Sequence, residues 1–138
     1  MTLQTNQRGQ VLIILVGVLF LGGATLAAGV FGTGKSLGDV GKSVKKQVAD
    51  ESRRNDAREV ISRWSSDVDG FLKQTGHRQK TMTKLMRRHD ATRPELTAVI
   101  SEQGFASDEI DRRALDYRFA LKEQLTREEW KRVFAVEH

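Results

Sequence analysis

The residues of this chain that most resemble a ligand-binding motif lie between positions 29 and 36. The segment GVFGTGKS satisfies the pattern G-x-x-x-x-G-K-[ST], in which backbone N–H groups cradle phosphates, the Lys pairs with them and the hydroxyl holds magnesium. That chemistry requires a buried strand before the loop and a helix after it, inside a parallel sheet. The preceding segment has the length of a membrane span, and no later apolar strand ends in an Asp. We therefore interpret residues 32–34 as the exit from a bilayer, with Lys35 at the headgroups.

The other side chains that could support catalysis do not form a recognisable site. On a straight helix His77 and His89 are rotated roughly a third of a turn from each other, His138 is far along the chain, and no H-E-x-x-H pattern is present. Cysteine is absent, which excludes disulfides and thiol chemistry. The acidic residues have Arg or Lys neighbours at helical spacing, as in solvated ion pairs. The sequence thus predicts no enzyme, cofactor, metal site or small-molecule substrate.

An uncharged N-terminal segment predicts that the protein is anchored in a membrane. Residues 9–34 carry no charge, and residues 11–32 are long enough to cross a bilayer as one transmembrane helix after a short polar tail, residues 1–10. The apolar run is too long for a typical secretory signal, so we expect a retained anchor. The small residues on which another membrane helix could pack are Gly22, Gly23, Ala27 and Gly29.

A basic juxtamembrane segment, residues 33–56, follows the predicted span. Its apolar residues recur at helical spacing and lysines fill the other side, which indicates either a stalk or an interfacial helix. Lysines close to a bilayer attract anionic headgroups by roughly 1 kcal/mol each. The lysines expected to contact headgroups are Lys35, Lys42, Lys45 and Lys46.

Residues 57–138 predict an all-α extramembrane domain. An apolar stripe with the spacing of one helix face predicts a long amphipathic helix to about residue 90, with a weak point near Gly76. A capping box at residues 92–95 opens a short helix, which we expect Gly104 to end. Ser107 then caps another helix, and a second capping box at residues 126–129 begins a terminal one.

The wide apolar faces of these helices require a partner. We expect the shorter helices to pack back on the long helix as a helical hairpin, although a homodimer would cover the same faces. The residues expected on the shared core or interaction face are Trp64, Phe71, Leu72, Tyr117, Leu121, Trp130 and Phe134.

Two C-terminal segments carry a family resemblance. At residues 115–119 (LDYRF) and 125–134 (LTREEWKRVF), the chain resembles uncharacterised bacterial single-span membrane proteins that end in a TREEW-x-x-VF element. More distantly it resembles the periplasmic stress and heavy-metal-resistance family marked by LTxxQ motifs. That resemblance implies a small, all-helical, often dimeric envelope protein that acts as a chaperone or sensor. Because Glu129 stands where the family has Gln, no functional residue is carried over.

Two features of the sequence predict opposite orientations in the membrane. Four lysines after the span favour a cytoplasmic C-terminal domain, whereas the resemblance implies a periplasmic one. Arg8 and the amino group on a short tail can hold the cytoplasmic side. We therefore expect a bacterial inner-membrane, single-pass protein whose C-terminal domain lies in the periplasm, with the cytoplasmic orientation as the alternative.

Together these patterns predict a non-enzymatic, membrane-anchored helical envelope protein that acts through protein contacts, as a stress-related, chaperone-like or assembly factor. The net charge is +5, but acidic and basic residues alternate, so no nucleic-acid partner is expected. One alternative is a pilin-like subunit processed after Gly9, because residues 8–10 resemble a pilin leader junction, although Ile14 stands where such pilins carry Glu. Another is a cytoplasm-facing membrane scaffold.

Overall fold

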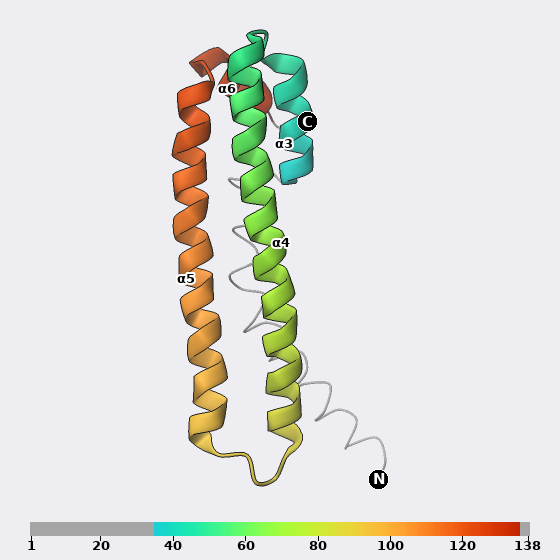
Figure 1. Ribbon diagram of the computed structural model, residues 1–138, viewed down its shortest axis with the longest axis vertical. Helices are drawn as coiled ribbons and strands as arrows, with labels where there is room; N and C mark the ends of the chain where they lie inside the picture. Colours follow the sequence, from blue (N-terminus) through green and yellow to red (C-terminus); the bar gives the residue numbers. More distant parts are fainter. Residues whose placement is uncertain (1–34, 136–138) are drawn as a thin grey trace.

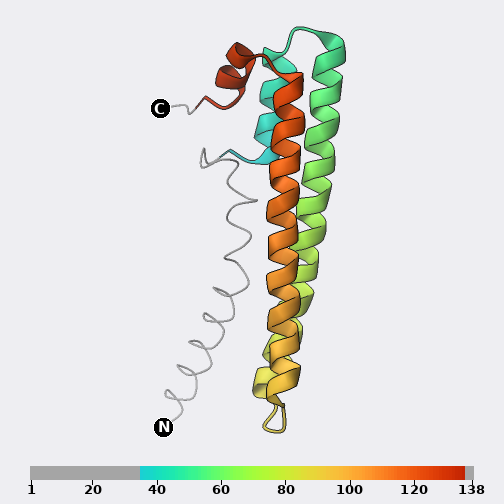
Figure 2. The same cartoon turned by 90° about the vertical axis from the view of Figure 1, so that its left-hand side faces the viewer.

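The computed structural model describes residues 35–135, and within that range the chain forms four helices and no strand. They are α3 (Leu37–Gln47), α4 (Glu51–Arg87), α5 (Arg93–Gln124) and α6 (Arg127–Val133). Figure 1 shows α4 and α5 as two long helices side by side, with α3 and α6 near the end opposite their connection. The view turned by 90° gives the same arrangement (Figure 2). The all-α prediction is confirmed.

The predicted transmembrane helix, with its small residues Gly22, Gly23, Ala27 and Gly29, lies outside the described residues. Within residues 35–135, the structure has no helix that combines the length and the apolar character needed to cross a membrane.

Local capping signals set the helix starts. Asp50 caps α4 by accepting a hydrogen bond of 2.8 Å from the Arg53 N–H. Both predicted capping boxes are present, at the starts of α5 and α6. In each box a Thr hydroxyl accepts from the N–H three residues later and a Glu carboxylate accepts from the Thr N–H, so two N–H groups at the helix start are satisfied.

The predicted helix end at Gly104 is wrong. α5 continues through Gly104, and Ser107, the expected N-cap of a separate helix, lies inside it. Glycine in a helix interior costs roughly 1 kcal/mol relative to Ala. The buried residues Val99, Gln103 and Ile110 keep one helical register across the glycine, so packing against α4 outweighs that cost. In place of the two or three shorter helices that were predicted, the structure has the long helix α5 and the short helix α6. Gly76 likewise lies within an uninterrupted α4.

The α3 segment is part of the bundle. Its residues Val40 and Val44 are fully buried, and α3 contacts both α4 and α6. The proposed boundary between a stalk and the helical domain, after residue 56, falls inside α4. The amphipathic pattern of residues 37–48 thus reflects burial against other helices of the same chain.

The core has two parts of unequal size. We call the part where α3 and α6 cover α4 and α5 the four-helix end; its buried residues include Trp64, Leu121 and Val133. The other part, the tip, has Met82 and Val99 as its buried apolar residues, with Leu85 and Leu96 packed against them.

A buried polar pair lies between the two parts. The Gln103 amide donates to the Thr75 hydroxyl at 3.1 Å, and both residues are at most 4% exposed. The Arg78 guanidinium also donates to the Gln103 carbonyl oxygen at 3.3 Å.

Candidate functional site

The described part of the phosphate-loop pattern takes structural contacts. Lys35 Nζ donates a hydrogen bond of 3.1 Å to the Val133 carbonyl in α6. The Ser36 hydroxyl caps α3 by accepting from the Asp39 N–H at 3.1 Å. Lys35 thus links the start of the described chain to α6, a contact across 98 residues that no local pattern predicts.

The other lysines expected at headgroups lie on α3 with their side chains in contact with solvent. Lys42, Lys45 and Lys46 are exposed. Lys42 and Lys45, together with Arg58, line a shallow cleft of about 640 Å³ between α3 and α4. Their positions leave their charges accessible, and the headgroup contact itself stays a prediction.

The residues expected on a shared face meet in the core, with one exception. Trp64, Phe71 and Leu121 are buried, and Tyr117, Trp130 and Phe134 pack against them from partly buried positions. Leu72 does not join this core, because its side chain is 42% exposed. It is one position along α4 from the buried Phe71, a rotation of about 100° away from α5.

An aromatic and ionic group joins α4 to α5 at the centre of this face. The rings of Trp64 and Tyr117 stack with centroids 6.0 Å apart. The Tyr117 hydroxyl donates to the Asp67 carboxylate, which Arg113 also contacts at 3.2 Å. The hydrogen bond to Asp67, with burial, raises the pKa of Tyr117. The hydrogen bond and the ion pair at Asp67 thus link α4 to α5.

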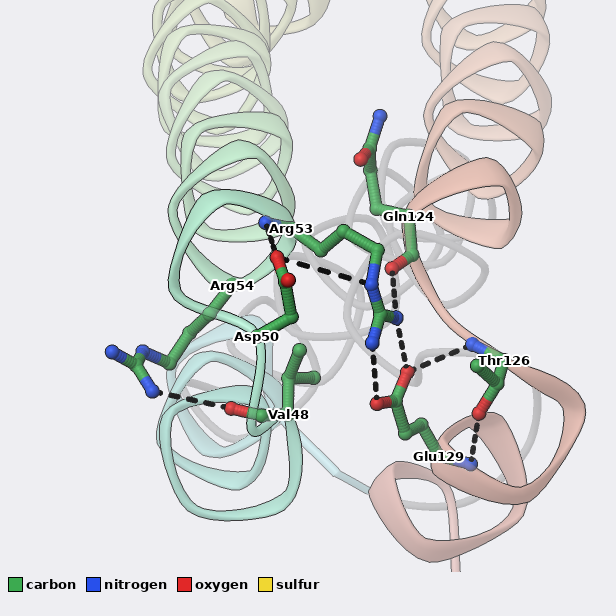
Figure 3. A network of polar contacts seen from close by, with 7 residues as sticks. All are labelled: Val48, Asp50, Arg53, Arg54, Gln124, Thr126 and Glu129. Carbon is green, nitrogen blue, oxygen red and sulfur yellow. Dashed lines mark hydrogen bonds and ion pairs between the residues drawn. The ribbon is translucent and has the colours of Figure 1, made fainter.

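A second polar group fixes α6 to α4. Figure 3 shows Arg53 between the carbonyl of Gln124 and the carboxylate of Glu129. The guanidinium donates to the two Glu129 oxygens at 2.6 and 3.0 Å and to the Gln124 carbonyl at 3.1 Å. The Arg53 hydrogen bonds, followed by that from the Thr126 N–H, lower the pKa of Glu129 from 4.5 to about 2. Sequence reasoning assigned Glu129 only its capping role, because its partner is 76 residues away.

The largest exposed apolar side chains of the described chain lie on one side of α5. Phe105, Leu115 and Phe119 are 76%, 57% and 54% exposed. At about 100° per residue they lie half a turn from Val99, Ile110 and Leu121, which face α4. We call these three residues the outer face of α5. The sequence prediction placed one apolar stripe on each helix, whereas α5 has two.

The histidines that the structure describes do not gather with other ligands. His77 and His89 are both exposed, and within residues 35–135 no three His, Asp or Glu side chains form a group that could hold a metal ion. His138 lies outside the described residues.

Comparisons with known proteins add no relative. No protein-family model, no curated protein and no solved structure matches this chain.

Proposed function

We propose that this chain is a non-enzymatic, membrane-anchored helical protein that acts through protein contacts made by the outer face of α5. The observation that carries the proposal is the placement of Phe105, Leu115 and Phe119 on the side of α5 that α4 does not cover. Each exposes more than half of a large apolar side chain, and apolar surface is stabilised by removal from water. Exposed apolar rows flanked by charged residues are typical of protein interaction sites.

The membrane part of the proposal rests on the amino-acid sequence. The uncharged residues 11–32 have the length of a membrane-spanning helix, and the lysines that follow have the position of headgroup contacts. We propose that the anchor lies in a bacterial inner membrane and that the helical bundle lies on its periplasmic side. A reporter fused to the C-terminus and active only in the periplasm tests the orientation, and activity of a cytoplasmic reporter at the same position would contradict it.

Site-specific photocrosslinking tests the contact face. A photoreactive amino acid replaces Phe105, Leu115 or Phe119, one at a time, in the full chain expressed in cells. The matched controls replace Lys73 and Lys84, which are exposed on α4 away from the outer face. We expect one discrete adduct at all three outer-face positions and none at the controls.

The mass of that adduct identifies the kind of contact. Twice the mass of the chain indicates self-association through α5, and any other single mass indicates a different protein. Equal adduct yields at Lys73 and Lys84 would show unspecific proximity and would contradict the proposed face.

A further inference from the structure

A pocket of about 530 Å³ lies where α5 meets α6. We call it the basic pocket. Four of its lining residues are cationic, and none of the described residues that line it is acidic. The residues that line it are Arg118, Lys122, Leu125, Thr126, Arg127, Trp130 and Lys131.

The pocket combines an aromatic wall with charges at its rim. The aromatic wall is Trp130, and the Arg118 guanidinium lies 5.3 Å from the centroid of its ring, within the range of a cation–π contact. Arg118 lies at the same distance from the ring of Phe119, which does not line the pocket. Leu125 is buried, whereas Lys122 and Arg127 are exposed. The site therefore offers an apolar base below several N–H donors.

Two cations of the pocket have no carboxylate partner among the described residues. Lys122 and Arg127 form no ion pair with any of residues 35–135, and Lys131 has one exposed contact of 3.6 Å with Glu128. Elsewhere on the bundle, arginines such as Arg113 lie against carboxylates. Four cations around one opening favour an anionic ligand, and several N–H donors suit the oxygens of a phosphate.

The position of the pocket along the chain indicates that the phosphate belongs to a membrane lipid. Lys35 is held at 3.1 Å to Val133 in α6, and Lys131 of the pocket precedes Val133 by two residues. From residue 32, the end of the predicted span, the chain to Lys35 covers at most roughly 11 Å in any conformation. The headgroup layer on each side of a bilayer is roughly 5–8 Å thick. An anchor that ends at residue 32 thus holds α6 close to the lipid phosphates.

We infer that the basic pocket binds the phosphate headgroup of an anionic membrane lipid. This inference rests on the proposed membrane anchor. It assigns a headgroup site to α5 and α6, where the sequence had predicted contacts by the lysines of α3. Arg118 and Lys122 bind the phosphate oxygens from α5, Arg127 and Lys131 bind them from α6, and the glycerol backbone lies against Trp130.

Quenching of Trp130 tests the site in the full chain. The protein is reconstituted in phosphatidylcholine nanodiscs with increasing mole fractions of phosphatidylglycerol and a fixed fraction of a lipid that carries a nitroxide on its headgroup. Trp130 is partly exposed at the pocket, whereas Trp64 is buried in the core, so headgroup nitroxides report on Trp130. We expect quenching to rise with the phosphatidylglycerol fraction and to weaken with added salt.

A charge-matched pair of variants locates the effect. The Lys122→Gln/Arg127→Gln variant removes two pocket cations, and the Lys73→Gln/Lys84→Gln variant removes two exposed cations of α4. At roughly 1 kcal/mol for each cation near a bilayer, the pocket variant should need at least about fivefold more phosphatidylglycerol for half of the quenching. The α4 variant should stay within about twofold of the unchanged chain. Equal losses in both variants would overturn the inference in favour of unspecific attraction.

Two further arms separate the alternatives. Inorganic phosphate added to pure phosphatidylcholine nanodiscs at constant ionic strength should leave the fluorescence of Trp130 unchanged. A response equal to that caused by phosphatidylglycerol would show that the pocket binds soluble phosphate and would overturn the inference of a lipid site. Flotation of the full chain with pure phosphatidylcholine vesicles tests the anchor by itself. If the full chain does not float with these vesicles, the anchor proposal is wrong. The lipid site is then tested by flotation with phosphatidylglycerol vesicles, which should be lost in the pocket variant and kept in the α4 variant.

Discussion

The four-helix end and the tip use the same two long helices but differ in how those helices are covered. At the four-helix end, α3 and α6 enclose the contact of α4 with α5, and side chains such as Trp64 and Leu121 are almost completely buried. At the tip, among residues 35–135, α4 and α5 pack only on each other, and Met82 and Val99 are the buried apolar residues. Local stability follows the amount of buried apolar contact. We therefore expect the tip to open at a lower free energy than the four-helix end.

The boundary between the two regions is the hydrogen bond between Thr75 and Gln103. Both side chains occupy positions where a continuous core would have apolar residues. A satisfied polar pair stabilises less than apolar packing of similar size, although it disfavours misaligned pairing of the helices. Along the bundle, the stable four-helix end is thus followed by a buried polar layer and then by the less stable tip.

Removing a large side chain from each region should give the largest contrast. Trp64→Ala should lower the free energy of unfolding by about 3–5 kcal/mol, because it deletes a large ring from an enclosed site. Met82→Ala should lower it by about 2 kcal/mol or less, because the two-helix tip can collapse around the smaller residue. Chemical denaturation followed by circular dichroism measures both.

Leu72→Ala provides the control on the same helix. Because Leu72 is 42% exposed, its truncation should change the unfolding free energy by about 0.5 kcal/mol or less. A loss from Met82→Ala equal to that from Trp64→Ala would contradict the proposed difference between the two regions.

Acid should weaken the four-helix end through Glu129. Its pKa is about 2 in the folded protein against 4.5 ordinarily, so below pH 4.5 the unfolded chain binds more protons than the folded one. The stabilisation is complete above pH 4.5 and is lost as the pH falls toward 2. We expect a loss of about 2 kcal/mol, less than the full pKa difference implies, because the Arg53 side chain is 36% exposed.

Two Gln substitutions isolate that carboxylate. Glu129→Gln keeps a capping side chain but removes the charge, so it should flatten the dependence of the denaturation midpoint on pH between 5 and about 2.5. Glu128→Gln, at an exposed neighbouring position, should leave the pH dependence unchanged. Equal flattening in both variants would mean that the Arg53–Glu129 pair is not its source.

Replacing the polar layer should reduce the difference between the regions. Thr75→Val and Gln103→Leu should each cost about 1–2 kcal/mol, since each leaves a buried partner without its hydrogen bond. The double variant should regain most of that loss, because Thr75 and Gln103 no longer leave each other without a partner and the apolar core becomes continuous. Arg78 loses its bond to Gln103 but is partly exposed and keeps its contact with Glu102 at 4.0 Å. Denaturation of the single and double variants measures this coupling, and strictly additive losses would contradict it.

The features that could be predicted from the sequence are those encoded by neighbouring residues. The capping pair Thr92 and Glu95 is three residues apart, and the stripe containing Trp64 and Phe71 repeats within one helix. The Arg53–Glu129 pair and the Lys35–Val133 contact join residues 76 and 98 positions apart, so only the folded chain brings them together. The sequence did place Tyr117 and Leu121 on the face of α5 that packs in the core. It did not indicate the second apolar face of that helix, which Phe105, Leu115 and Phe119 form on the exposed side.

The smallest expected effect concerns the glycine that was wrongly expected to end a helix. In α5 a Cβ added at Gly104 would meet no atom within 4 Å, so Gly104→Ala fits without a clash. We expect it to raise the free energy of unfolding by about 0.4–1 kcal/mol, because Ala loses less backbone freedom than Gly on forming a helix. Amide hydrogen exchange should place the gain in the tip half of α5.

Gly76→Ala gives the matched comparison on α4, where an added Cβ also meets no atom within 4 Å. Because both glycines lie inside continuous helices, the two substitutions should stabilise the protein by similar amounts and add in the double variant. If Gly104 instead ended a helix in solution, its backbone would adopt a conformation that Ala disfavours, and Gly104→Ala alone would destabilise. If Gly76→Ala raised the free energy of unfolding and Gly104→Ala lowered it, α5 would be broken at Gly104 in solution, contrary to the continuous helix of the structure.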